Sequence, residues 1–338
     1  MSGASVPFLP RSRVAAVQAA PVFLDPAATV AKACALIAEA AGNGAKLIAF
    51  PEVFVAAYPY WNWLMTPIEG AEWHDRLYRA SILADGPEVA LLRDAARAHD
   101  CTVVIGINER DPFSVGTIYN SNMVIGADGS LLGRHRKLVP TWAEKLTWAG
   151  GDGSSIRVYD TPVGPLGTLA CGENTNTLAR FALLSQGELV HVANYISLPV
   201  APASYNMAEA IKIRATAHSF EGKVFTIVAC STVSAEIIDA MSADRPANRE
   251  LLSRPNSAFS GVIDPHGNLI GEALIDDEGI VYADIDLGEC IRPKLMHDIT
   301  GGYNRFDIFN LTVDRTPRAS ALFFDGAQPV DPDEEEPS

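Results

Sequence analysis

The amino-acid sequence predicts an α/β layered protein built on a mixed sheet or sheets. Short, continuous apolar runs alternate along the chain with longer segments in which apolar residues recur at helical spacing. Two pairs of apolar runs are joined by short turns containing Asp and Gly, which is typical of β-hairpins. No linker rich in Pro, Gly and Ser divides the 338 residues, so the sequence favours a single domain.

The chain begins with an alternation of predicted strands and helices. Residues 12–21 predict a buried strand. Asp25 followed by Pro26 predicts the start of a helix, because Asp accepts N-cap hydrogen bonds and Pro suits the first helical position. The buried face predicted for this helix consists of Val30, Cys34, Ile37 and Ala41. Residues 45–52 predict the next strand, whose continuous apolar run indicates a covered sheet.

The remainder of the chain predicts two hairpins and further strands linked by helices. The hairpins cover 119–137 and 258–274, and 279–287 adds a strand. The other predicted elements are helices over 87–100 and 205–222, a helix directly after Cys171, and strands over 101–107, 167–170, 187–194 and 223–230. The acidic, proline-containing run 331–338 predicts a disordered tail.

The charge of the chain limits its partners. A formal net charge of −15 argues against nucleic acids and anionic membrane surfaces, because both repel an acidic protein. No run approaches the roughly 20 apolar residues that a membrane-spanning helix needs. The opening stretch MSGASVPFLPRSR lacks the basic and apolar regions of a signal peptide, which favours a cytoplasmic location.

The cysteines and histidines follow neither a disulfide pattern nor a metal-site pattern. An odd number of scattered cysteines does not indicate a disulfide framework: Cys34, Cys101, Cys171, Cys230 and Cys290. No CxxC, HxH, HxxxH or HExxH spacing occurs, so we expect no metal. No GxGxxG or GxxxxGK[ST] loop occurs either, so we expect no nucleotide cofactor.

Three chemically active side chains each follow a predicted strand. Glu52 ends the run LIAFPE, Lys137 ends GRHRK, and Cys171 follows GTLA. Side chains at the ends of strands collect at one edge of a sheet, where clefts usually form. Together they supply a base, a cation for an anionic intermediate and a nucleophile, and the lysine charge is expected to lower the pKa of the thiol.

Each of these three residues also has an ordinary explanation when taken alone. A glutamate is usually solvated surface, a lysine in RHRK usually belongs to an exposed charge cluster, and a cysteine before a helix is usually a small core residue. A histidine partner for Cys171, as in cysteine proteases, also stays open. His191 is the nearest histidine that follows it, inside a predicted strand.

Four segments, in order, resemble the nitrilase (carbon–nitrogen hydrolase) superfamily and, within it, the nitrilase branch. FPEVFVAAYPYW resembles the segment with the catalytic glutamate, which assigns Glu52. HRKLVPTWAEKLTWAGGDGS resembles the lysine segment, which assigns Lys137 and a supporting glutamate, Glu144. GTLACGENTNTLARFAL is similar to the nucleophile segment, which assigns Cys171. GGYNRFDIFNL, residues 301–311, resembles a C-terminal segment that simple amidases of the superfamily usually lack.

This resemblance implies an architecture and an assembly. The expected fold is a four-layer α-β-β-α sandwich, with a carbon–nitrogen hydrolase domain over 11–288. A C-terminal extension over 289–338 is expected to serve assembly. The resemblance also implies a homodimer or a larger helical homo-oligomer.

The resemblance further implies a nitrilase that converts an organic nitrile to the carboxylic acid and ammonia. Cys171 would attack the nitrile carbon, Glu52 would move protons, and Glu144 would position Lys137 or water. Lys137 and the backbone N–H after Cys171 would stabilise the tetrahedral intermediate. The alternatives are an amidase or a cyanide-hydrating enzyme of the same superfamily, or an inactive scaffold or binding protein.

Candidate substrate-binding residues lie near these positions in the sequence. They are Tyr58, Trp142, Gly172, Glu173 and Asn194. The neighbouring aromatic residues Tyr60, Trp61 and Trp63 fit either a pocket for an aryl nitrile or packing in a core or interface.

The chain departs from the nitrilase pattern at three places. Gly172 stands where nitrilases commonly have tryptophan, which predicts a wider or differently shaped pocket. Ala56 and Ala57 replace the usual Pro-Gly, and Gly302 replaces the usual histidine. These differences leave the chemistry intact and bear on the class of substrate.

Overall fold

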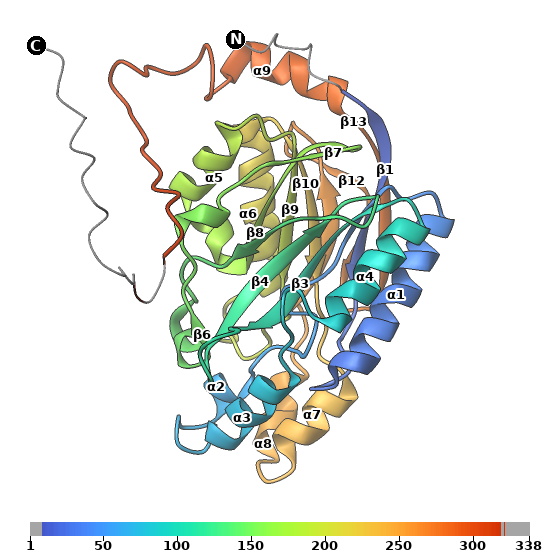
Figure 1. Ribbon diagram of the computed structural model, residues 1–338, viewed down its shortest axis with the longest axis vertical. Coiled ribbons are helices and arrows are strands. Elements are labelled where there is room, and N and C mark those ends of the chain that lie inside the picture. Colours follow the sequence, from blue (N-terminus) through green and yellow to red (C-terminus); the bar gives the residue numbers. More distant parts are fainter. Residues whose placement is uncertain (1–8, 319–320, 322–338) are drawn as a thin grey trace, which may run out of the picture.

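The computed structural model describes residues 9–318 and 321, which form two β-sheets packed face to face (Figure 1). The first sheet has the strand order β13-β1-β2-β3-β4-β5, with β6 paired to β4. Its strands are β1 (Arg11–Gln18), β2 (Leu47–Ala49), β3 (Thr102–Arg110), β4 (Ile118–Ile125), β5 (Leu131–Arg136), β6 (Trp148–Ala149) and β13 (Gly279–Asp286). The second sheet has the order β12-β11-β10-β9-β8-β7. Its strands are β7 (Tyr159–Thr161), β8 (Gly164–Ala170), β9 (Val190–Tyr195), β10 (Phe225–Cys230), β11 (Phe259–Ile263) and β12 (Leu269–Ile275).

Both sheets are mixed, as the sequence predicts. Strands β1, β2 and β3 run parallel, and so do β8, β9 and β10. The two predicted hairpins, β4–β5 and β11–β12, are antiparallel. Parallel neighbours need a long crossover, whereas antiparallel ones need only a turn, so the helical and Asp-Gly connections determine these directions.

Helices cover the outer face of each sheet and complete a four-layer α-β-β-α sandwich, which confirms the predicted fold. Helices α1 (Pro26–Gly42) and α4 (Pro87–Ala98) pack on the first sheet, and α5 (Thr177–Leu184) and α6 (Met207–Gly222) pack on the second (Figure 1). The smaller helices are α2 (Trp61–Leu64), α3 (Ala71–Ala80), α7 (Ala235–Ser242), α8 (Ala247–Leu252) and α9 (Ile291–His297). Short 3₁₀ turns cover Trp142–Leu146, Gly153–Ser155, Cys171–Thr175 and Leu287–Cys290.

The alternation of side chains along β1 shows how one strand serves two cores. Ala15 and Val17 pack toward α1 and α4, whereas Val14 and Ala16 pack between the two sheets. Successive side chains of a strand point to opposite faces, so a strand buried on both faces reads as one continuous apolar run.

The first helix begins where the sequence predicts. The Asp25 side chain accepts a hydrogen bond from the backbone N–H of Ala28, and Pro26 opens α1. Its fully buried face is rotated slightly from the predicted one. It contains Ala33 and Ala40 together with the predicted Val30 and Ile37, while Cys34 and Ala41 are half-buried.

Two local predictions need correction, and four short helices were missed. The strand predicted over 45–52 is limited to β2, because the chain turns away before Glu52 and Val53 adopts a positive φ of 41°. The helix predicted directly after Cys171 begins later, since a 3₁₀ turn occupies Cys171–Thr175 and α5 starts at Thr177. The short helices α2, α3, α7 and α8 were not predicted, because their apolar residues lack a long helical repeat.

The C-terminal region leaves the sandwich after β13. Helix α9 follows, and residues 301–311 then run close to α5 without forming a regular element. The predicted disordered tail over 331–338 lies outside the described residues. Among the helices of the described part, none is both long and apolar enough to cross a bilayer. The predicted cytoplasmic location stays a prediction.

Candidate active site

Glu52 lies in a tight loop between the two sheets. Its backbone N–H donates to the carbonyl of Tyr195, at the end of β9 in the second sheet. A Cβ on Gly106 of β3 would lie 2.3 Å from the backbone nitrogen of Val53, so only glycine lets this loop approach the strand so closely. The Glu52 side chain is buried, and the loop therefore aims a carboxylate into the interior.

The Lys137 ammonium joins two buried carboxylates. Its Nζ lies 2.8 Å from Glu52 Oε1 and 2.7 Å from Glu144 Oε2, and all three side chains are almost completely buried. Asn120 of β4 also donates to Glu52 Oε1, at 2.7 Å. Glu52 Oε2 has no hydrogen-bond partner within the described part of the chain. One oxygen of Glu52 is thus fixed and the other is free to act.

Glu144 is held by its own 3₁₀ turn. Its Oε2 accepts from the backbone N–H of Thr141 at 2.7 Å, which forms a capping box, and its Oε1 accepts from the Tyr58 hydroxyl at 3.2 Å. The Tyr58 oxygen in turn accepts from Trp63 Nε1 at 2.9 Å. These contacts fix the carboxylate that holds Lys137 from the side opposite Glu52.

Cys171 lies at a strained bend between β8 and the following 3₁₀ turn. Its φ is +47°, a left-handed conformation that costs a non-glycine residue roughly 1–2 kcal/mol. Side chains from the same turn hold this bend. Glu173 accepts from the backbone N–H of Ala170, and Asn174 donates to the carbonyls of Leu169 and Cys171.

The charges around Cys171 set its resting state. Burial, followed by the Glu52 carboxylate, raises the pKa of the Cys171 thiol well above its usual value, while Lys137 acts in the opposite direction. The expectation that the Lys137 charge lowers the pKa of the thiol is confirmed, but burial and the Glu52 carboxylate outweigh the lysine. Cys171 therefore rests as a thiol.

Burial and the neighbouring charges shift the pKa values of Glu52 and Lys137 in different ways. Burial raises the pKa of Glu52, Lys137 opposes the rise, and Glu144 adds to it. Burial alone would lower the pKa of Lys137, but the carboxylates of Glu144 and Glu52 reverse this and raise it well above its usual value. The lysine thus stays charged, while the glutamate can exchange a proton.

The predicted pocket residues differ in their exposure and in their hydrogen-bond partners. Tyr58 is buried against Glu144, whereas Trp142 is 79% exposed and packs edge-on against Trp63. Both carboxylate oxygens of Glu173 are used within the protein, by His135 and by the backbone of Ala170 and Leu138, so this residue holds the turn instead of lining a pocket.

Gly172 and Asn194 lie beside the reactive turn. A Cβ on Gly172 would lie 3.0 Å from Thr141 Oγ1, so the space that a larger residue would need is partly filled by Thr141. Asn194 is paired in register with Ala170 and donates to Asn122 Oδ1 at 2.6 Å. Its own Oδ1 has no partner in the described region.

The aromatic residues after Tyr58 belong to the scaffold. Tyr60 and Trp61 are each 1% exposed, and the Tyr60 hydroxyl donates to the Ser197 carbonyl. Trp61 stacks on Trp73 of α3. Of the two interpretations of this stretch, the structure supports packing for both residues.

Two residues near the site were not found from the sequence. Asn120 fixes Glu52, and its signal was present: Asn120 and Asn122 lie on one face of β4, a strand that is almost completely buried. Tyr195 is fully buried, and its hydroxyl has no partner in the described structure. Burial and the nearby Cys171 raise the pKa of Tyr195 well above its usual value, so the hydroxyl stays protonated and can donate.

A large cavity lies elsewhere on the molecule. It has a volume of about 810 Å³ and lies beside β5 and the chain near Arg318. None of the predicted active residues lines it. Three of its four arginines pair with acids: Arg134 and Arg136 with Glu109, and Arg318 with Asp314. The fourth, Arg157, donates to the carbonyl of Ser154.

Comparisons with known proteins show which proteins this chain is similar to. The family model described as carbon-nitrogen hydrolase matches residues 13–294. An aliphatic nitrilase of Rhodococcus rhodochrous is 40% identical over 319 residues, covering 92% of this chain and 85% of that protein. Nitrilase 1 of Arabidopsis thaliana is 37% identical over 320 residues, covering 92% and 89%.

Solved structures support the fold. The nitrilase-superfamily protein Nit3 of Saccharomyces cerevisiae superposes with a TM-score of 0.67 at 20% identity, covering 87% of this chain and 97% of that one. A carbon-nitrogen hydrolase of Helicobacter pylori gives 0.67 at 18% identity, covering 88% and 97%. With the family match spanning most of its length, this chain belongs to the carbon–nitrogen hydrolase family.

Proposed function

We propose that this protein is a nitrilase that hydrolyses an organic nitrile to the carboxylic acid and ammonia. Relatives named as nitrilases, at 34–40% identity over 90% or more of this chain, support this activity. The observation that carries the assignment of residues is one buried ammonium, Lys137, bonded to both Glu52 and Glu144 beside the Cys171 thiol. This arrangement combines a nucleophile, a base and a fixed positive charge.

The first step is attack of the thiol on the nitrile carbon. Because Cys171 rests as a thiol, Glu52 accepts its proton, using the oxygen that has no partner in the described structure. The new S–C bond forms as one C–N π bond breaks, and Glu52 delivers the proton to nitrogen. The product is a covalent thioimidate.

Two waters complete the reaction. The first adds to the thioimidate carbon and gives a tetrahedral intermediate, which loses ammonia and leaves a thioester. The second water hydrolyses the thioester, releasing the acid and restoring the thiol. The sum is one nitrile and two waters giving one acid and one ammonia. If the intermediate expels the thiolate instead of ammonia, the product is the amide.

Lys137 supplies charge stabilisation in both hydrolytic steps. Its raised pKa keeps it cationic, and its two carboxylate partners hold it in place, so little reorganisation is needed as negative charge develops. The backbone N–H of Gly172, directly after the nucleophile, is the second proposed donor. We assign Glu144 to positioning Lys137, because it contacts the ammonium directly.

We also propose that the C-terminal extension over 289–338 serves assembly into a homodimer or a larger helical homo-oligomer. Apolar side chains are exposed in it, with Phe306 at 55% and Phe309 at 68%. They line, with Leu178 and Phe181 of α5, a groove of about 720 Å³. Light scattering of the full chain and of a Phe306→Ser, Phe309→Ser variant tests this, and equal masses would contradict it.

A panel of aliphatic, aromatic and arylaliphatic nitriles, scored for both ammonia and amide, tests the activity. We expect ammonia from at least one nitrile, and turnover of that nitrile well above turnover of the corresponding amide. Preferential hydrolysis of the amide would support the amidase alternative. Turnover of cyanide alone would support the cyanide-hydrating alternative.

A further inference from the structure

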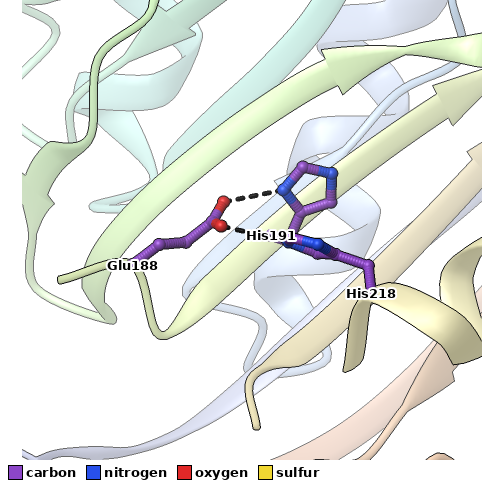
Figure 2. A group of neighbouring side chains, drawn as sticks. All are labelled: Glu188, His191 and His218. Carbon is purple, nitrogen blue, oxygen red and sulfur yellow. Dashed lines mark hydrogen bonds and ion pairs between the residues drawn. The ribbon is translucent and has the colours of Figure 1, made fainter. Parts of the chain in front are cut away.

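A buried cluster of titratable side chains lies behind the nucleophile and takes no part in the reaction above. Glu188 lies just before β9. Its Oε1 is 2.7 Å from Nδ1 of His191, and its Oε2 is 3.0 Å from Nε2 of His218 in α6 (Figure 2). Side chains of all three residues are at most 1% exposed. We call these three residues, together with Asn174, the Glu188 network.

The fold makes specific room for this network. A Cβ on Gly167 of β8 would lie 2.0 Å from Glu188 Oε1, so a side chain there would overlap the carboxylate. Gly167 is paired in register with His191 on the neighbouring strand. The absence of a side chain at this position lets the carboxylate lie against the sheet beside His191.

The network reaches the nucleophile through Asn174. The Nδ2 of this residue donates to the carbonyl of Leu169 at 3.1 Å and to the carbonyl of Cys171 at 3.0 Å. Two carbonyl partners fix the amide orientation, because a reversed amide would point an acceptor at two acceptors. Asn174 Oδ1 therefore faces His191 Nε2, at 2.8 Å.

This orientation determines the protons on His191. Since Asn174 Oδ1 can only accept, Nε2 of His191 must carry a proton. Its Nδ1 lies 2.7 Å from Glu188 Oε1. Burial raises the pKa of Glu188, but His191 and the hydrogen bonds that the carboxyl accepts from both rings lower it below its usual value. Glu188 is thus a carboxylate, and Nδ1 of His191 must also donate.

The second histidine stays neutral. Burial, followed by the neighbouring His191, lowers the pKa of His218 to about 4, and Arg180 of α5 acts in the same direction. One proton on Nε2 satisfies the bond to Glu188, and Nδ1 has no partner in the described structure. The single positive charge of the cluster therefore belongs to His191.

A metal ion held by Glu188, His191 and His218 is the other chemistry that this donor set allows. Such an ion would need lone pairs of Glu188 and the two histidines that instead take part in the hydrogen bonds of 2.7 and 3.0 Å between them. It would also leave the orientation of Asn174 unexplained. The hydrogen-bonded arrangement accounts for all four side chains.

We propose that the Glu188 network holds His191 as a doubly protonated imidazolium and, through Asn174, locks the Cys171 peptide in its left-handed conformation. The charged histidine makes Asn174 a stronger donor, because hydrogen bonds in a chain polarise one another. Asn174 then secures the carbonyl groups on both sides of the bend. These are positioning residues for the nucleophile, and their role rests on the proposed function only through the use of Cys171.

The first test is a ¹⁵N-histidine spectrum of the full-length wild-type protein, which needs no nitrile. We expect both ring nitrogens of His191 to carry protons, with no change after treatment with a chelator. Glu188→Gln is the matched variant, since its amide can donate to His191 Nδ1 and its carbonyl can accept from His218. It is expected to convert His191 to the neutral form protonated on Nε2. An unprotonated His191 nitrogen in the wild type, or a spectrum that responds to the chelator, would overturn the proposal.

The second test measures the reactivity of the nucleophile. We expect Asn174→Ala to lower kcat by about 100-fold with KM unchanged, because misplacement of the reacting group affects the chemical step. Alkylation of Cys171 by iodoacetamide, followed by peptide mass spectrometry, is expected to slow in parallel. Glu188→Gln is expected to lose less activity than Asn174→Ala, because it keeps every hydrogen bond.

The control is Ser219→Ala, which removes a buried hydroxyl bonded to Thr226 on the same helix as His218 but outside the network. It is expected to keep wild-type kcat and alkylation. A folded Asn174→Ala protein with wild-type kcat and alkylation would overturn the proposal. A wild-type protein that turned over no nitrile would refute the proposed function alone, because the spectra and the alkylation would still report on the network.

Discussion

The two sheets contribute to the site in different ways. The first sheet and its loops supply charged side chains, Glu52 and Lys137, which neutralise one another directly across 2.8 Å. The second sheet supplies Cys171. Around it, Glu173 accepts a hydrogen bond from the backbone N–H of Ala170, and Asn174 donates to the carbonyls of Leu169 and Cys171. One half of the site is therefore stabilised by charge pairing and the other by control of the backbone. We therefore expect a change in the charge-paired half and a change in the bend to affect stability and activity to different extents.

Removing the thiol gives the largest expected effect on activity and almost none on structure. Cys171→Ala is expected to lower the release of ammonia by at least about 10⁴-fold, because removal of a nucleophile eliminates the covalent route. The charged half is untouched, so the urea unfolding midpoint should stay near wild type. Ammonia release at the wild-type rate would show that the second sheet does not supply the nucleophile.

Removing the ammonium tests the charged half. Lys137→Met leaves Glu52 and Glu144 facing each other without a cation, and breaking a buried ion pair in this way costs about 3–5 kcal/mol of unfolding free energy. Activity is expected to disappear as well. Urea unfolding of this variant beside Cys171→Ala measures the difference between the two halves, and equal stability of the two proteins would break the comparison.

The pH profile sharpens the role of Glu52. The pKa of its carboxyl is raised above the ordinary 4.5, so it takes up a proton at a pH where a solvated glutamate is still ionised. If the carboxylate is the active form, kcat/KM falls as the pH drops through this raised pKa. The acidic limb of the profile should lie above pH 4.5, and Glu52→Gln should lower kcat by about 10²–10⁴-fold. A limb at or below 4.5 would contradict the assignment.

The smallest effect concerns strain in the loop of Glu52. Ala57 has a φ of +84°, a conformation that favours glycine. Ala57→Gly relieves this strain but loses chain entropy on folding, so we expect a net gain of up to about 1 kcal/mol in unfolding free energy. Ala49→Gly, in the extended strand β2, is the matched control and should destabilise the protein. Destabilisation by Ala57→Gly would show that the loop does not store strain.

The sequence predicted most of the layered fold because its signals are periodic and local. The cap at Asp25, the Asp-Gly hairpins and the continuous apolar strands each depend on neighbouring residues. The prediction was weaker where the chain turns tightly. The early end of β2 and the 3₁₀ turn at Cys171 depend on bonds to distant segments, such as that from Glu52 to Tyr195.

The site was only partly accessible from the sequence. Strand ends and the resemblance brought Glu52, Lys137 and Cys171 forward, and the structure brings the first two into direct contact. The sequence predicts correctly that Lys137 lowers the pKa of the Cys171 thiol, but it does not show that burial and Glu52 outweigh the lysine. Neither the burial of the thiol nor its closeness to Glu52 can be read from the local sequence.

Gly167 couples two positions that are 21 residues apart in the sequence, since a side chain there would overlap the carboxylate of Glu188. The two positions therefore cannot vary independently. An alanine at 167 should be tolerated only after the acid at 188 has been shortened or lost, whereas a change at 188 needs no prior change at 167. This ordered epistasis gives a direction to the substitutions by which the protein can diverge, and it should be visible in the fitness of paired variants.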